Sequence, residues 1–177
     1  AKVADIRDLR VSVPLKYAGE AFSSPIGPLK PHAPANGIII RHGYIVAEWG
    51  DPQRVDMTFS VTKTFLTTVV GLAWQRGLIH DVNDYVSDYM PPGVDLFEAP
   101  HNRKIKWDHL LRQTSDWQGT LWGKPDWADR PEGEKPADWP NRKLWEPGTH
   151  YKYNDVRVNV LALAALNVWR RPLQEVL

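Results

Sequence analysis

The stretch Phe59-Ser60-Val61-Thr62-Lys63-Thr64-Phe65 begins an amphipathic pattern in this 177-residue chain. Apolar residues recur at spacings of three and four after it, which predicts a helix over residues 60–76. The residues expected on its buried face are Val61, Phe65, Val69, Leu72 and Ala73. Gly77 follows, and glycine suits the left-handed conformation in which many helices end. We therefore expect this helix to organise the fold, with Ser60 at its first turn.

Ser60 and Lys63 are spaced so that the serine Oγ and the lysine Nζ can meet on one face of that helix. A serine hydroxyl is a weak nucleophile until a base removes its proton, and a lysine can be that base if burial lowers its pKa toward neutrality. The helix N-terminus adds backbone N–H groups beside a developing oxyanion. The same serine also fits a simpler role as the N-cap of the helix.

Other segments show weaker patterns. Residues 1–36 are rich in proline and predict an extended lead-in, and residues 37–51 predict a hairpin that turns at Arg41-His42-Gly43. Asp81 is expected to cap a second helix, whose apolar stripe is Val82, Tyr85, Val86 and Tyr89. Further helices are expected over residues 105–112 and 155–170, and a new one after Pro172.

Residues 113–147 carry five tryptophans but no periodicity. Disordered segments are poor in aromatic residues, so we expect an ordered loop beside a functional site. Trp117 and Trp122 are candidates for an apolar wall that binds substrate, and core packing is the alternative.

Composition excludes several functions. There are 22 Lys and Arg against 21 Asp and Glu, so the basic excess of a nucleic-acid binder is lacking, and no apolar run is long enough to span a membrane. The chain has no cysteine, and its six histidines show no metal-ligand spacing. We therefore expect no metal and no other cofactor.

Four motifs in order resemble the serine β-lactamase and penicillin-binding-protein superfamily, specifically its class C and esterase-like branch. They are the hairpin, the Ser-x-x-Lys of Ser60 and Lys63, the Leu-Leu-x-x-Thr-Ser of residues 110–115, and a Pro-Gly-Thr run that leads to Tyr153. The resemblance extends from about residue 37 to residue 177. It implies an α+β fold in which residues 37–177 form the N-terminal part of one catalytic domain, with hairpin 37–51 and helical region 60–177.

By this resemblance Ser60 is the acylated nucleophile, and Lys63 and Tyr153 are the proton-transfer groups. The family's usual Asn is replaced by Asp155, with Asn154 one residue earlier. An amide can donate to a substrate carbonyl, whereas an ionised carboxylate only accepts. Either Asp155 has another role, such as pairing with Lys63, or Asn154 takes over substrate binding. Relatives also often have His and Gly where Gln113 and Asp116 stand, in a segment expected to support the fold.

The family's third motif, a Lys/His-Thr/Ser-Gly strand that supplies an oxyanion N–H, is not found after Tyr153. We therefore expect that the C-terminal strands of the sheet are missing from this chain, and that a second polypeptide or a C-terminal segment completes the fold. The expected function is a serine hydrolase for a small-molecule ester, amide or β-lactam substrate. The alternative, favoured by Asp155, is a non-catalytic binding or assembly module. Exported relatives suggest a periplasmic or extracellular location.

Overall fold

The computed structural model describes residues 34–129, 133 and 135–177. The predicted lead-in over residues 1–36 therefore lies almost entirely outside the described residues. The contacts divide the chain into two compact units, Ala1–Thr58 and Phe59–Leu177, and each is described by itself.

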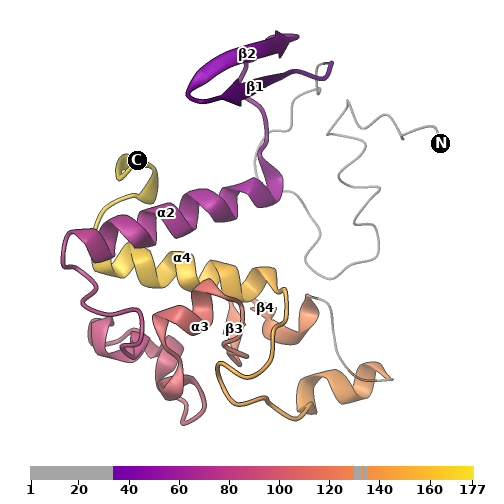
Figure 1. Ribbon diagram of the computed structural model, residues 1–177. Coiled ribbons are helices and arrows are strands. Elements are labelled where there is room, and N and C mark those ends of the chain that lie inside the picture. Colours follow the sequence, from indigo (N-terminus) through magenta and orange to yellow (C-terminus); the bar gives the residue numbers. More distant parts are fainter. Residues whose placement is uncertain (1–33, 130–132, 134) are drawn as a thin grey trace. The chain divides into compact units, whose positions relative to one another are not determined.

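The described part of the first unit is the predicted hairpin, which is confirmed (Figure 1). Strands β1 (Gly37–Arg41) and β2 (Tyr44–Trp49) pair antiparallel, with Arg41 opposite Tyr44. His42 and Gly43 form the turn at φ angles of 52° and 83°. Two consecutive positive φ angles are those of a type I′ turn, whose twist matches that of the two strands.

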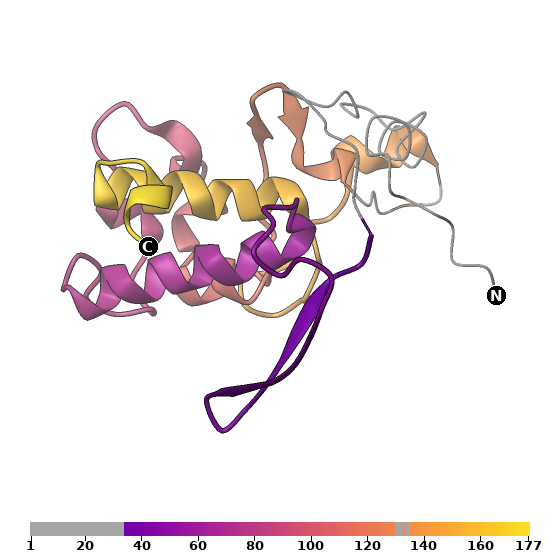
Figure 2. The ribbon, with the colours of Figure 1, turned by 90° about the horizontal axis from the view of Figure 1, so that it is seen from above.

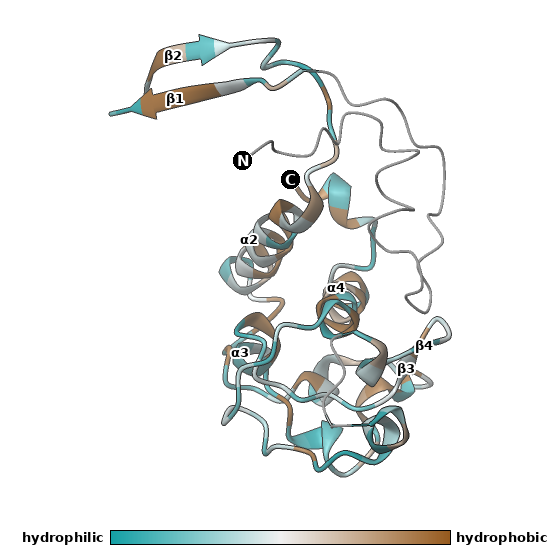
Figure 3. Cartoon of the chain, turned by 90° about the vertical axis from the view of Figure 1, so that its right-hand side faces the viewer, coloured by the Kyte–Doolittle hydropathy of each residue, from teal (hydrophilic) through white to brown (hydrophobic). Residues whose placement is uncertain are grey.

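Apolar side chains project from this hairpin into solvent. Both strands are exposed along almost their whole length, and Figure 3 shows β1 as largely hydrophobic. The most exposed aliphatic side chains of the hairpin are Ile39, Ile40, Ile45 and Val46. The hairpin thus carries apolar side chains on the surface of its own unit.

The second unit is built on two long helices, α2 (Thr62–Gln75) and α4 (Asp155–Trp169), which lie side by side in Figures 1 and 2. Trp169 at the end of α4 donates its indole N–H to the backbone carbonyl of Val69 in α2, at 3.2 Å. The helices expected over residues 60–76 and 155–170 are confirmed. Gly77 ends α2 at a φ of 72°, as its position predicted.

The buried face of α2 is rotated from the expected one. Val69 and Ala73 are buried as predicted, but Val61 and Phe65 are 58% and 48% exposed. Their places in the core are taken by Leu66 and Val70. Residues 66, 69, 70 and 73 form the continuous stripe that packs into the core, because they recur at spacings of three and four.

The prediction of a second helix after Asp81 is wrong. Only a short 3₁₀ turn, η2 (Val86–Tyr89), forms there. The carboxylates of Asp81 and Asp84 instead accept the backbone N–H groups of Asn83 and Asp81, which makes a local turn. Short polar side chains that bond nearby backbone compete with helix formation in this way. Tyr85 is extended and bridges to Lys106, so the chain leaves the helical path.

The remaining elements are short. The helix expected over residues 105–112 is confirmed as α3 (Trp107–Leu111), and Pro172 is followed by a single turn, η7 (Leu173–Glu175). Strands β3 (Thr120–Leu121) and β4 (Lys124–Pro125) form a small hairpin. The other short turns are η1 (Phe59–Val61), η3 (Asp95–Phe97), η4 (Asn102–Lys104), η5 (Asp126–Ala128) and η6 (Pro136–Asn141).

Helices and small antiparallel sheets together confirm the predicted α+β class. Among the helices of the described residues, none has the length and apolar character needed to cross a membrane.

Candidate active site

Ser60 lies in η1, directly before α2. Its Oγ is 3.2 Å from Nζ of Lys63 and 2.8 Å from the phenol oxygen of Tyr153. The N-cap of α2 is Val61, with no side-chain cap hydrogen bond, so the simpler role of Ser60 as N-cap is wrong. Phe59, next to the serine, has a φ of 47°. Such strained backbone in a residue other than glycine is concentrated at functional sites.

Lys63 connects the serine to the start of α4. Its Nζ lies 2.8 Å from Oδ1 of Asp155 and 4.8 Å from the centre of the Tyr153 ring. Of the two roles that the sequence left open for Asp155, the structure therefore shows the pairing with Lys63. Burial by itself lowers the pKa of Lys63, but the hydrogen bonds to Asp155 and Tyr153 outweigh it and raise that pKa above its ordinary value. The ammonium form is thus stabilised here.

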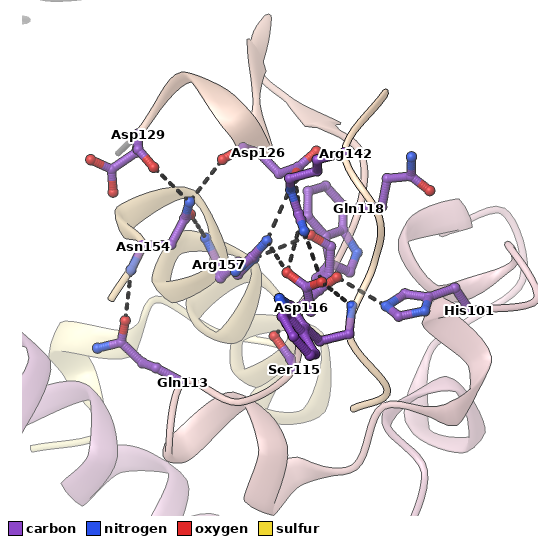
Figure 4. A network of polar contacts seen from close by, with 12 residues as sticks. His101, Gln113, Ser115, Asp116, Gln118, Asp126, Asp129, Arg142, Asn154 and Arg157 are labelled. Carbon is purple, nitrogen blue, oxygen red and sulfur yellow. Dashed lines mark hydrogen bonds and ion pairs between the residues drawn. The ribbon is translucent and has the colours of Figure 1, made fainter. Parts of the chain in front are cut away.

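Asn154 is fully buried and serves the fold, which corrects its expected place in substrate binding. Its Oδ1 accepts the backbone N–H of Arg157 and caps α4. Its Nδ2 donates to the backbone carbonyls of Asp126 and Asp129, at 2.7 and 3.1 Å. Because each polar atom of this amide is used inside the protein, none is left for a substrate (Figure 4).

The backbone that carries Tyr153 is fixed by the segment around Gln113. The Gln113 side chain accepts the N–H of Asn154 at 2.8 Å, and its backbone carbonyl accepts the N–H of Lys152 at 3.0 Å. Residues on both sides of Tyr153 are therefore anchored to the same residue. This anchoring holds the phenol close to Ser60.

A buried charge network is centred on Asp116 (Figure 4). The Asp116 carboxylate pairs with Arg142 at 2.8 Å and with Arg157 at 2.6 Å, and Asp126 pairs with Arg142 at 3.1 Å. Burial raises the pKa of Asp116, but the two arginines outweigh this effect and hold it below its ordinary value. The network attaches Asp116, Asp126 and Arg142 to the first turn of α4.

The sequence did not predict this network. One signal was present: Arg157 falls in the apolar stripe of α4, at helical spacing from Val160, Leu161 and Ala164. A charged residue in a core stripe is almost always paired. Asp116 adopts a φ of 44°, which aspartate tolerates better than most residues.

The two candidate tryptophans lie outside the serine cluster. Trp117 is buried and donates its indole N–H to the backbone carbonyl of Leu96, so it belongs to the core, which corrects the expected substrate wall. Trp122 is 72% exposed and lines a groove with Leu163, Leu166 and Pro172. That groove lies about two turns along α4 from Asp155. The loop that carries both residues is ordered where it is described, but these two side chains are not brought to Ser60.

Within the described residues, no three His, Asp or Glu side chains are grouped so that they hold a metal ion. The groups that meet in the serine cluster are a hydroxyl, an ammonium, a phenol and a carboxylate.

A family model matches most of the chain. The family model described as Beta-lactamase matches residues 38–177. The comparison with curated proteins found no match. The matched region includes the hairpin strands from Ile38 onward and the whole Ser60 cluster. The chain therefore belongs to the beta-lactamase family, within the serine hydrolase superfamily.

Proposed function

We propose that this protein hydrolyses an ester or amide bond of a small molecule, with β-lactams included among the candidates, through an acyl-enzyme on Ser60. The observation that carries the proposal is the contact of the Ser60 hydroxyl with both the Tyr153 phenol, at 2.8 Å, and the Lys63 ammonium, at 3.2 Å. A nucleophile in hydrogen-bond reach of a base that a third group orients is the pattern of covalent catalysis.

Tyr153 is the proposed base. Lys63 is held as an ammonium by its partners, so it has no lone pair with which to take a proton. The Lys63 ammonium lies 4.8 Å from the centre of the Tyr153 ring, so the proposed base reacts beside a positive charge. As Ser60 Oγ attacks the carbonyl carbon, Tyr153, reacting as the phenolate, takes the serine proton. The phenol that forms then gives this proton to the leaving oxygen or nitrogen and returns to the phenolate. Water then attacks the carbonyl carbon of the acyl-enzyme while Tyr153 takes a proton from it. Tyr153 returns this proton to Ser60 Oγ, which leaves, and the acid is released.

The tetrahedral oxyanion needs N–H donors. The backbone N–H of Ser60 is the proposed donor on this chain, and the second comes from a strand that the resemblance expects downstream. We propose that a further polypeptide segment supplies this strand and pairs with the β1–β2 hairpin. The exposed apolar side chains of the hairpin support this, because an isolated two-stranded hairpin is marginal in water. The intact mass of the purified protein would show whether this segment is joined to the chain or separate.

The test of the reaction is hydrolysis of a chromogenic acyl ester by the complete protein. Ser60→Ala is expected to reduce turnover to background, whereas Thr68→Ala, which removes an exposed hydroxyl from α2, is expected to leave it unchanged. Turnover that survives in Ser60→Ala would contradict the proposal. Saturable ligand binding without turnover, and unchanged by Ser60→Ala, would select the non-catalytic module that Asp155 favours.

A further inference from the structure

We propose that Asp155 makes the site selective for substrates that carry an ammonium group, or another strong hydrogen-bond donor, on the acyl part close to the scissile carbonyl. This inference rests on the proposed function, because it concerns the same site. It assigns to Asp155 a role in specificity in addition to its pairing with Lys63.

The two oxygens of the Asp155 carboxylate lie in different surroundings. Oδ1 is shielded from solvent and faces the Lys63 ammonium at 2.8 Å. The side chain as a whole is 49% exposed, so the exposed oxygen is Oδ2. One ammonium group separates this carboxylate from the Ser60 hydroxyl. Oδ2 therefore faces solvent at the edge of the cluster that contains the nucleophile.

Among the described residues no hydrogen bond reaches this second oxygen. Nζ of Lys63 donates to Oγ of Ser60 at 3.2 Å and faces the carboxylate of Asp155 through the shielded Oδ1, at 2.8 Å. Asn154, the nearest amide in the sequence, donates to Asp126 and Asp129 instead. Oδ2 is thus left to solvent or to a substrate that brings a donor of its own.

The chemistry of this oxygen sets the preference. An ionised carboxylate only accepts hydrogen bonds, so a donor on the acyl group gains a charge-assisted bond. A substrate carbonyl at the same place gains none, and a substrate carboxylate is repelled. An asparagine at position 155 can donate to a carbonyl as well as accept from a donor, so it would remove this order of preference.

The experiment uses three p-nitrophenyl esters with acyl groups of similar size: 3-aminopropanoate, butanoate and the succinate half-ester. For the complete protein at neutral pH, kcat/KM is expected to be about tenfold higher for the ammonium ester than for butanoate, and lowest for succinate. In Asp155→Asn the ratio of ammonium ester to butanoate is expected to fall toward one. Because the ratio compares two substrates on one enzyme, a general loss of rate from disturbing Lys63 cancels.

Asp88→Asn is the matched control. It removes the same charge from an exposed aspartate in η2, beyond the C-terminal end of α2, and is expected to keep the wild-type ratio. Equal kcat/KM for the ammonium and butanoate esters, or a preference that survives in Asp155→Asn, would overturn the inference while ester hydrolysis still supports the proposed function. Absence of hydrolysis of all three esters, together with failure of a fluorophosphonate to label Ser60, would overturn both.

Discussion

The hydroxyl oxygens of Ser60 and Tyr153 lie 2.8 Å apart, although 93 residues separate them in the sequence. The contact joins the turn before α2 to the irregular segment before α4. Tyr153→Phe removes the phenol but keeps the ring, so we expect kcat to fall about 10²–10⁴-fold through loss of general base catalysis. Steady-state hydrolysis of a chromogenic ester measures this change in kcat. Tyr151→Phe, at a tyrosine that is 63% exposed, should keep wild-type kcat. Equal activity of Tyr153→Phe and wild type would exclude Tyr153 as the base.

The protonation state of Lys63 can be measured directly. Since its pKa is raised above the ordinary lysine value of 10.5, the ammonium should persist through neutral pH and titrate above that value. Carbon-13 NMR of the Lys63 side chain follows this titration. In Asp155→Asn the largest raising influence is lost, so the midpoint should move to lower pH. A midpoint near neutrality in the wild type would instead identify Lys63 as the base.

Asp116→Asn tests the buried charge network. The substitution keeps the side-chain shape and tolerates the positive φ, but removes the carboxylate that lies closest to both Arg142 and Arg157 and leaves them Asp126 alone, at 3.1 and 3.6 Å. We expect a loss of about 3 kcal/mol in the free energy of unfolding, measured with urea at neutral pH. Asp108→Asn, which breaks a more exposed pair with Arg112, should cost less than about 1 kcal/mol. Similar losses in the two variants would contradict a structural role for the network.

The same carboxylate predicts how stability depends on pH. The folded-state pKa of Asp116 lies below the ordinary value of 3.8, so its stabilisation is fully present above that value and is lost as the pH falls through the folded-state pKa. The free energy of unfolding of the wild type should therefore fall more steeply at acid pH than that of Asp116→Asn. If the free energies of unfolding of the two proteins, measured with urea, fall equally steeply at acid pH, Asp116 is not the group responsible.

Gly148→Ala tests the backbone that leads to Tyr153. Gly148 has a φ of 92°, and a Cβ there would lie 2.8 Å from Nε2 of His109. Both effects are unfavourable, so we expect a loss of about 1 kcal/mol or more in the free energy of unfolding. Gly71→Ala, inside α2 with open space around it, should be neutral or stabilising. Thermal unfolding measures the stability of both variants. A Gly148→Ala variant as stable as Gly71→Ala would contradict the conclusion that position 148 requires glycine.

Local patterns account for the parts of the fold that sequence predicted. Helices α2 and α4 follow from apolar periodicity, and the hairpin follows from a turn at Gly43 between apolar runs. The helix expected after Asp81 failed because Asp81 and Asp84 bond to nearby backbone, and a periodicity argument does not weigh that competition.

The candidate site residues also divide into those that local spacing predicts and those that depend on long-range contacts. Ser60 and Lys63 are found by their helical spacing, whereas Tyr153 is found only through the family resemblance, because its contact with Ser60 is long-range. The burial of Asn154 depends on backbone carbonyls of residues 126 and 129, and no sequence pattern reveals those partners.

The central claim is that Ser60 is the nucleophile, and covalent labelling of the complete protein tests it most directly. After reaction with a fluorophosphonate, peptide mapping by mass spectrometry should find the adduct on Ser60 alone, with slower labelling in Tyr153→Phe and none in Ser60→Ala. An adduct on another residue, or no adduct in a protein that hydrolyses esters, would contradict the account.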